Sequence, residues 1–243
     1  NLLDGAIVRQ EDGKPVKVPG LFKDVKGIGW YVDIFQQAQI SINFNNYKES
    51  TIHDVFDAAC KLADERGLRV TGSELVGLIP LDAMIMAGKH YLIKQNRSTG
   101  LPISDIVECA VQSLGLNDVT PFIAKEKIID YAVKSNSGSL MYLEGKQFLN
   151  EVSTNSPAPG GGSVSALVGA LGAGLSSMVA ALTHEKKEMF DRRQEMNDIG
   201  VKAQLIKDRL AILVDEDTNA FKNVMAANRL PETAENEKKE KKK

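Results

Sequence analysis

Residues 157–175 read PAPGGGSVSALVGALGAGL, a proline and glycine turn that leads into a run of very small residues. A Walker-type phosphate loop needs GxxxxGK[ST], and no lysine follows Gly162. A dinucleotide-binding fingerprint must follow a strand, whereas the preceding NEVSTNSPAP has the composition of a helix end and a turn. The stretch therefore matches neither kind of nucleotide loop.

A membrane span is the second interpretation, because no charged residue occurs in residues 152–183 and about 20 apolar residues suffice to cross a bilayer. Repeated Gly and Ser, few bulky aliphatic residues and no Trp or Tyr at the edges argue against it. We predict instead a soluble helix over residues 163–182, buried on most sides and capped by Ser163. It is entered through Gly160, Gly161 and Gly162, whose N–H groups can attract anions or polar heterocycles. Glycines that merely permit a tight turn explain the pattern equally well.

The composition of the whole chain excludes some classes of function. The 243 residues are 43% hydrophobic and 26% charged with a net charge of −2, and this near-neutral balance gives no electrostatic reason to expect nucleic acid as a partner. Cys60 and Cys109 lie in apolar helical stretches, which is typical of buried thiols in a reducing cytoplasm. Neither these cysteines nor the three histidines have metal-ligand spacing, so we expect no bound metal.

The residues before position 134 alternate between β-rich and helical patterns. We predict paired strands within residues 25–44 and a helix capped by Ser50 or Thr51 that ends at Gly67. Further along we expect a short strand and loop at 68–80, a helix at 81–96, and a turn with a short helix opened by Pro121.

The chain therefore has a predicted two-domain architecture, an α/β first domain with interleaved strands and helices followed by an all-α helical domain. The boundaries are residues 1–133, a linker at 134–139 that lacks apolar residues, and a helical domain at 140–243 with helices near 142–152, 163–182 and 190–227. The terminal EKKEKKK is expected to be a solvated end. The missing initiator methionine and the small number of helices suggest that the sequence begins and ends inside a longer protein.

One carboxylate interrupts the apolar pattern of the last helix. Asp217 falls within an apolar stripe at three-and-four spacing, which consists of Ile206, Leu210, Leu213, Val214, Phe221 and Val224. We predict that Asp215 and Glu216 face solvent and that Asp217 is buried. Desolvation raises the pKa of a carboxyl group toward values that suit acid–base catalysis, so Asp217 is a candidate catalytic residue. A buried aspartate satisfied by a neighbouring N–H group or cation is the alternative.

The stretch SPAPGGGSVSALVGALGAGLSSMVAALT together with LVDEDTNAF resembles the N-terminal half of the cyclodeaminase domain of formiminotransferase-cyclodeaminases. Upstream, KGIGWYVD, AQISIN and GSELVGLIPLDAM resemble the C-terminal subdomain of the formiminotransferase part. The resemblance implies transfer of a formimino group from formiminoglutamate to tetrahydrofolate, the co-substrate. It also implies cyclisation of 5-formiminotetrahydrofolate to 5,10-methenyltetrahydrofolate with release of ammonia.

By the same resemblance, Asp217 matches the catalytic aspartate of the cyclodeaminase, and residues Gly160 to Ser163 line the folate pocket. The histidine of the transferase belongs to a subdomain that this sequence lacks, so neither His53 nor His90 takes its role. The resemblance also implies a homo-oligomer, since the helical domain needs partner helices. A methenyltetrahydrofolate cyclohydrolase and a non-catalytic helical interaction module are the alternatives.

Overall fold

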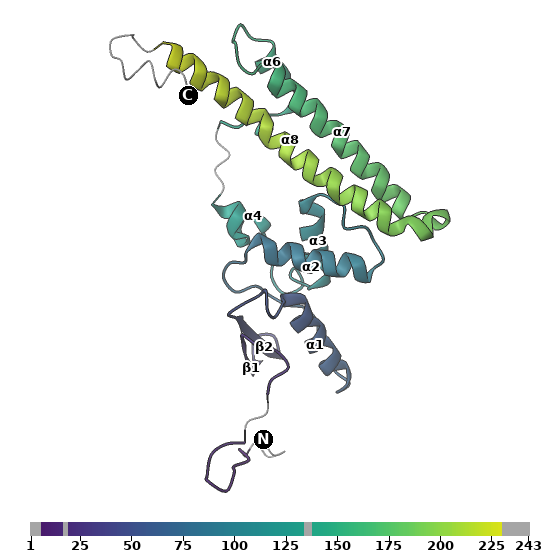
Figure 1. Cartoon of the computed structure of the whole chain (residues 1–243). Helices are drawn as coiled ribbons and strands as arrows, with labels where there is room; N and C mark the ends of the chain where they lie inside the picture. Colours follow the sequence, from purple (N-terminus) through teal and green to yellow (C-terminus); the bar gives the residue numbers. More distant parts are fainter. Residues whose placement is uncertain (1–5, 17–18, 134–137, 230–243) are drawn as a thin grey trace. The chain divides into compact units, whose positions relative to one another are not determined.

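The computed structural model describes residues 6–16, 19–133 and 138–229, and most of the expected linker and the charged C-terminal end lie outside these ranges. The chain divides into two compact units, and the boundary between them in the sequence lies between Thr71 and Gly72. A small two-stranded sheet with helices makes up the N-terminal part, and the C-terminal region is mostly helical (Figure 1). The expected fold class is confirmed.

The first unit contains the predicted pair of strands and the predicted helix. β1 (Val25–Val32) pairs antiparallel with β2 (Gln37–Phe44), so that Val25 lies opposite Phe44. α1 (Ile52–Asp64) has Thr51 as its N-cap, whose Oγ1 accepts a hydrogen bond from the Asp54 N–H at 3.3 Å. After α1, Gly67 takes a φ of 70°, in the left-handed region that glycine favours. Thr51 is therefore the cap, while the Ser50 hydroxyl donates to the Lys23 carbonyl.

In the second unit, α2 (Leu81–Lys94) packs against α3 (Ile103–Ser113) through large apolar side chains. Met84 and Leu92 have no exposed surface, and 3% of Ile106 is exposed. A Cβ atom on Gly88 would overlap the Ile106 carbonyl oxygen, so the two helices approach closely only because this residue is glycine. Cys109 of α3 is buried as expected, and Cys60 of α1 is half-buried.

Two local predictions on either side of these helices are wrong. No strand forms within residues 68–80, where Gly77 has a φ of 86° and only Ile79 makes an isolated bridge, to Ile128. The helix expected after Pro121 begins at Ala124 and is split into α4 (Ala124–Lys127) and α5 (Ile129–Ala132). The fully buried Ile128 has an extended backbone between them, because its neighbours hydrogen-bond to Ile79 as in a sheet.

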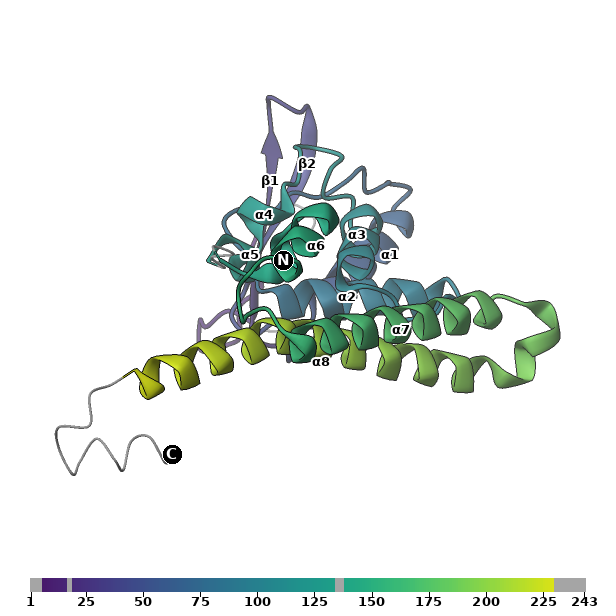
Figure 2. The same ribbon diagram turned by 90° about the horizontal axis from the view of Figure 1, so that it is seen from above.

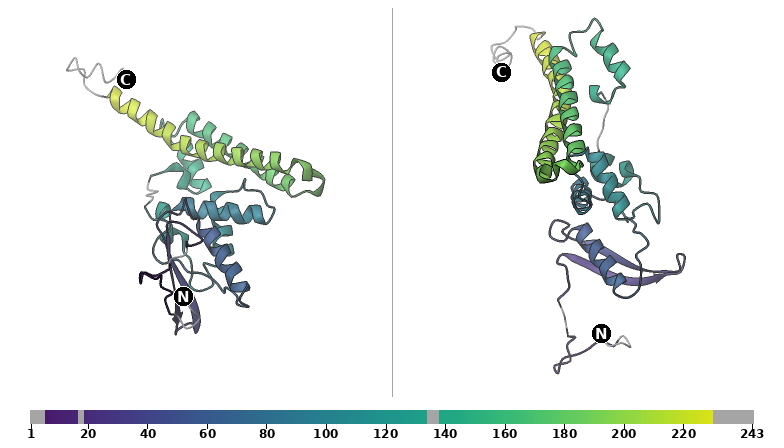
Figure 3. Two further views of the ribbon diagram at one scale, coloured as in Figure 1. Left: turned by 60° about the horizontal axis from the view of Figure 1, so that its bottom comes forward. Right: turned by 90° about the vertical axis from the view of Figure 1, so that its right-hand side faces the viewer.

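The remaining residues form a helical hairpin with short elements before it. η1 (Leu140–Tyr142) and α6 (Gly145–Val152) precede α7 (Gly161–His184), and η2 (Lys187–Arg192) turns the chain into α8 (Arg193–Asn228). α7 and α8 lie side by side and antiparallel (Figures 2 and 3). The hydrogen bonds fix their register, since Gln204 Nε2 donates to Ser177 Oγ and Arg193 Nε donates to the His184 carbonyl.

The loop between α2 and α3 packs on this hairpin within the second unit. Gly100 meets Gly200 backbone to backbone, and a Cβ on Gly100 would lie 2.6 Å from the Gly200 carbonyl carbon. Ser177 Oγ donates to the Gly100 carbonyl at 3.0 Å. The Asn197 side-chain oxygen accepts hydrogen bonds from Ser98 Oγ and from the Thr99 N–H and Oγ1. Two glycines and four polar side chains therefore hold the loop to the hairpin.

The prediction that α7 is buried on most sides is wrong. Its buried residues form one narrow stripe, which consists of Ser163, Ala170, Ser177, Ala180 and His184. Large aliphatic side chains such as Leu171, Leu175 and Val179 are 57–62% exposed. α7 is also long and apolar enough to cross a membrane, and 22% of its most apolar window is buried. One such helix is weak evidence for a span, because buried helices of soluble proteins meet the same length and composition test.

Candidate functional site

The predicted glycine residues form the first turn of α7, next to the second half of α8. Gly160 is the N-cap, so the helix begins before Ser163, and the prediction that Ser163 caps it is wrong. A Cβ atom would have free space at Gly161 and an ordinary contact at Gly160. The first N–H groups of any helix lack partners within that helix. The open glycine turn leaves these donors at the positive end of the α7 dipole.

Gly162 touches the carboxylate of Asp217. A Cβ atom on Gly162 would overlap Oδ1 and would lie 2.5 Å from Cγ and 2.6 Å from Oδ2 of Asp217. A side chain at position 162 would therefore displace the carboxylate, and the glycine lets the carboxylate lie across the first turn of α7. The structure brings together the glycine stretch and the aspartate, which are more than fifty residues apart in the sequence.

Ser163, which is buried, hydrogen-bonds to the same carboxylate of Asp217. Its hydroxyl oxygen lies 3.0 Å from Asp217 Oδ2, 2.9 Å from the Val214 carbonyl oxygen and 2.9 Å from Thr218 Oγ1. Ser163 has no exposed surface and 4% of Thr218 is exposed. The sequence suggested that Ser163 lines the pocket, but its hydroxyl is enclosed by these three partners.

Asp217 itself is exposed, contrary to the prediction that it lies on a buried face. The apolar stripe around it is covered only in part: Val214 is fully buried, while Ile206, Phe221 and Val224 are 41–55% exposed. A two-helix hairpin buries only the side of α8 that faces α7, which explains the difference. The carboxyl group is therefore anchored on one side by Ser163 and open on the other, where a substrate can reach it.

The neighbouring acidic residues have separate structural partners. Asp215 accepts hydrogen bonds from Ser139 Oγ at 2.6 Å and the Leu140 N–H at 2.7 Å, so it is half-buried rather than solvent-facing. Glu216 is exposed as predicted and forms a two-point ion pair with Arg209 at 2.9 and 3.0 Å. Of these three carboxylates, Asp217 is the one at the start of α7.

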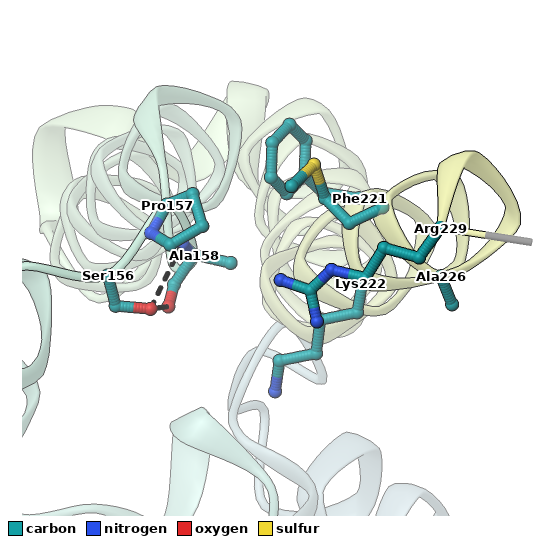
Figure 4. Close-up of a pocket in the computed structure, with 8 residues that line it drawn as sticks. Ser156, Pro157, Ala158, Phe221, Lys222, Ala226 and Arg229 are labelled. Carbon is teal, nitrogen blue, oxygen red and sulfur yellow. Dashed lines mark hydrogen bonds between the residues drawn. The ribbon is translucent and has the colours of Figure 1, made fainter.

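A pocket of about 280 Å³ lies further along α8. The loop that leads into the glycine turn forms one wall, and α8 forms the other (Figure 4). The lining residues are Ser156, Pro157, Ala158, Phe221, Lys222, Met225, Ala226 and Arg229. Lys222 and Arg229 give the α8 wall two cations, which the sequence pattern does not indicate. The i, i+4, i+8 spacing of Asp217, Phe221 and Met225 along one face of a helix could have indicated the pocket.

The opposite end of the hairpin, where α7 ends and α8 begins, is held by Arg193 and contains the buried His184. His184, the last residue of α7, is 7% exposed, and burial together with the nearby Arg193 charge lowers the pKa of its imidazole, partly opposed by Glu185. The cation that meets the C-terminal end of α7 is Arg193, which donates to the His184 carbonyl at 3.0 Å.

Two family models match the chain. The formiminotransferase domain model matches residues 5–134, and the formiminotransferase-cyclodeaminase model matches residues 144–243. The chain is 38% identical over 224 residues to a formimidoyltransferase-cyclodeaminase from Dictyostelium discoideum, a match covering 90% of the chain and 41% of that protein. It is 35% identical to the Sus scrofa protein of the same name, with 96% of the chain and 43% of the relative covered.

A third relative matches a shorter stretch. A methenyltetrahydrofolate cyclohydrolase from Methylorubrum extorquens is 35% identical over 91 residues, which cover 37% of the chain and 44% of that protein. The chain spans about two fifths of the length of the two formimidoyltransferase-cyclodeaminases. Its two model matches follow one another in the chain, and the glycine turn and Asp217 both lie within the second, so the chain belongs to the formiminotransferase-cyclodeaminase family.

Proposed function

We propose that this chain is part of a bifunctional folate-dependent enzyme of histidine degradation. One activity transfers the formimino group of formiminoglutamate to tetrahydrofolate, and the other converts 5-formiminotetrahydrofolate to 5,10-methenyltetrahydrofolate and ammonia. The chain carries residues for the second activity. The observation that supports this most directly is the exposed carboxyl group of Asp217, held by buried Ser163 against the side-chain-free Gly162.

The cyclodeaminase reaction requires one proton to move between two nitrogens of the substrate. In the protonated formimino substrate, N10 attacks the formimino carbon, and the N10–H proton must leave as the new C–N bond forms. The departing nitrogen must gain a proton before its C–N bond breaks and ammonia leaves. We assign both transfers to Asp217, which accepts the proton from N10 as a carboxylate and gives it to the leaving nitrogen as a carboxylic acid. The substrate cation and the methenyl product carry the same charge, so atoms and charge balance without a metal ion.

The adjacent pocket suits a folate. Folates carry carboxylate groups on the glutamate side and an aromatic ring system on the other, and the pocket wall offers Lys222, Arg229 and the ring of Phe221. The free N–H groups of the glycine turn, from Gly160 to Gly162, can meet polar edges of the substrate. We therefore propose that these glycines bind substrate and that Asp217 is the catalytic residue.

A methenyltetrahydrofolate cyclohydrolase is the second candidate. The Methylorubrum extorquens relative of that name matches 91 residues of this chain at 35% identity. The match of residues 5–134 to the formiminotransferase domain favours the bifunctional enzyme, because a cyclohydrolase does not need that part. A non-catalytic helical module would leave the open carboxyl group of Asp217 without a role.

We further propose a cytoplasmic homo-oligomer with no membrane span and no nucleic-acid partner. The exposed aliphatic residues of α7, including Leu171, Leu175 and Val179, would be covered by a second copy of the chain, since exposed apolar patches commonly mark interfaces. The domain boundaries at 133 and 140 are part of this proposal. Residue 133 lies close to the end of the first matched region at 134, and residue 140 lies close to the start of the second at 144. Native mass measured for wild type and for Leu171→Ser/Leu175→Ser tests the interface. A smaller species is expected in the variant, and an unchanged mass would reject α7 as the contact surface.

Formation of 5,10-methenyltetrahydrofolate from 5-formiminotetrahydrofolate, followed by absorbance with the protein at its natural length, tests the function. Wild type is expected to turn the substrate over, and Asp217→Asn is expected to lower kcat by about 100- to 10,000-fold, the usual contribution of a general acid–base residue. Hydrolysis of the methenyl compound without use of the formimino compound would favour the cyclohydrolase. Full turnover by Asp217→Asn would remove Asp217 from the mechanism.

A further inference from the structure

The hydroxyl of Ser163 has more acceptors around it than it has protons. It has one proton to donate and can accept two hydrogen bonds. Both the Val214 carbonyl oxygen, at 2.9 Å, and Asp217 Oδ2, at 3.0 Å, lie in donating geometry. The third partner, Thr218 Oγ1, lies at 2.9 Å and can itself donate. The single proton of Ser163 can therefore point at Val214 or at Asp217, but not at both.

The two orientations correspond to the two protonation states of Asp217. An ionised carboxylate only accepts, so Ser163 donates to Oδ2 and accepts from Thr218. A protonated carboxyl group can donate its Oδ2–H to Ser163 Oγ, and the Ser163 proton then turns to the Val214 carbonyl oxygen while Thr218 still donates. Every polar group is satisfied in each state, and no heavy atom has to move. In the ionised state, Val214 keeps its helical bond from the N–H four residues later.

The residues around Ser163 exclude water from its hydroxyl, so its proton can turn only between Asp217 and Val214. Its hydroxyl has no exposed surface, so water does not compete for the proton, and 4% of Thr218 is exposed. The carboxylate lies against Gly162 with no side chain between them. The same buried hydroxyl cannot touch a substrate, so its influence passes through Asp217.

We infer that Ser163 is a positioning residue that holds the Asp217 carboxyl group in one orientation, both as carboxylate and as carboxylic acid, by turning its hydroxyl between Asp217 and Val214. This inference rests on the proposed function, in which Asp217 must take up and give back a proton within one turnover. Because only hydrogen atoms move, Oδ2 stays in place after it gains the proton from N10. Its O–H then turns from Ser163 to the leaving nitrogen and delivers the proton, and Ser163 turns its own proton from Val214 back to Oδ2.

A second buried serine on the same helix provides a matched control. Ser177 is 1% exposed and its hydroxyl also donates to a backbone carbonyl, that of Gly100, at 3.0 Å. It lies fourteen residues further along α7 and its partners are Gly100 and Gln204. Ser177→Ala therefore removes a comparable buried hydrogen bond without touching the proposed site.

The test compares Ser163→Ala, Ser177→Ala and Asp217→Asn in the protein at its natural length, with the absorbance assay for the methenyl product. In Ser163→Ala we expect kcat to fall about 10- to 100-fold with KM changed less than about 3-fold, since misplacing a reacting group by about 1 Å can cost about 100-fold. Ser177→Ala is expected to keep kcat within about twofold at a similar loss of thermal stability. The ratio of kcat in H₂O to that in D₂O should rise in Ser163→Ala but not in Ser177→Ala, because proton transfer becomes slower only in the first of these two variants.

Two further variants keep the test usable if Ser163→Ala does not fold. Ser163→Cys retains a weak donor and should have a kcat between those of Ser163→Ala and wild type. Thr218→Val leaves Ser163 in place, so its kcat should fall less than that of Ser163→Ala. If Asp217→Asn is inactive and the Ser163 variants turn over as fast as Ser177→Ala, the inference is wrong and the proposed function stands. If wild type does not convert the formimino substrate, the proposed function is wrong and the inference fails with it.

Discussion

The α2–α3 pair and the α7–α8 hairpin meet their partners through different side chains. Between α2 and α3 the largest buried groups are apolar, including Met84 and Leu92 with no exposed surface. Between α7 and α8 the buried stripe is small or polar, including Ser163 and Ser177, while Leu175 is 59% exposed. The first pair gains its stability from apolar burial, whereas the second gains close approach and a network of hydroxyl groups, and leaves large aliphatic residues of α7 exposed. Small residues matter in the second arrangement, because they let the Asp217 carboxylate of α8 reach the first turn of α7 at Gly162.

The largest expected effect comes from a substitution in the apolar contact between α2 and α3. Leu92→Ala should lower the free energy of unfolding by about 2–5 kcal/mol, since it removes a fully buried side chain and leaves a cavity. Thermal and urea unfolding followed by circular dichroism measure this loss. Leu68→Ala, at a leucine that is 63% exposed, is the control and should stay within about 0.5 kcal/mol of wild type. Equal losses in both variants would contradict the contrast between buried and exposed aliphatic residues.

The next largest effect is expected from a substitution that breaks the backbone contact between the α2–α3 loop and the hairpin. Gly100→Ala should cost about 1–3 kcal/mol, because the new Cβ would lie 2.6 Å from the Gly200 carbonyl carbon and the two backbones must separate. Gly172→Ala is the matched control on α7, where a Cβ has no neighbour within 4 Å. It should instead gain up to about 1 kcal/mol, as alanine is the better helix former. A Gly100→Ala variant as stable as wild type would show that the loop and the hairpin can separate freely.

The smallest expected effect is the contribution of His184 to the loss of stability at acidic pH. Burial, helped by the charge of Arg193, lowers the pKa of His184 in the folded chain, while the unfolded chain has the ordinary value of about 6.5. Unfolding then takes up a proton below that value. The contribution is therefore fully present above about pH 6.5, declines as the pH falls, and levels off beneath the lowered folded pKa. In His184→Gln the unfolding temperature should fall less between pH 7 and pH 5 than in wild type. Parallel curves for the two proteins would contradict this role for His184.

Local signals predicted much of the fold. Thr51 and Gly67 bound α1 because a capping hydroxyl and a left-handed glycine act within a few residues of the chain. The pairing of β1 and β2 follows from alternation and a short turn. The run of small residues identified α7, and the apolar stripe drew attention to Asp217, because both are periodic features of one helix.

Contacts between distant segments could not be predicted. The exposure of Asp217 depends on how much of α8 its partner covers, and the periodicity of one helix does not contain that information. The half-burial of Asp215 depends on Ser139, which is 76 residues away. The enclosed position of Ser163 likewise depends on Val214 and Thr218 of the other helix. Within the glycine turn, only Gly162 faces the Asp217 carboxylate, and the sequence of the turn does not distinguish it from Gly160 and Gly161.

The contact between Gly100 and Gly200 has a genetic consequence. Each residue already has the smallest side chain, so a substitution at one position has no compensating smaller residue at the other. Suppressors of Gly100→Ala should therefore lie away from Gly200, at positions such as Ala180, whose Cβ lies near Gly200 and where a change to glycine would let the backbone of α8 shift. The α2–α3 loop and the hairpin should then accumulate substitutions around an unchanging pair, although the two segments match different family models.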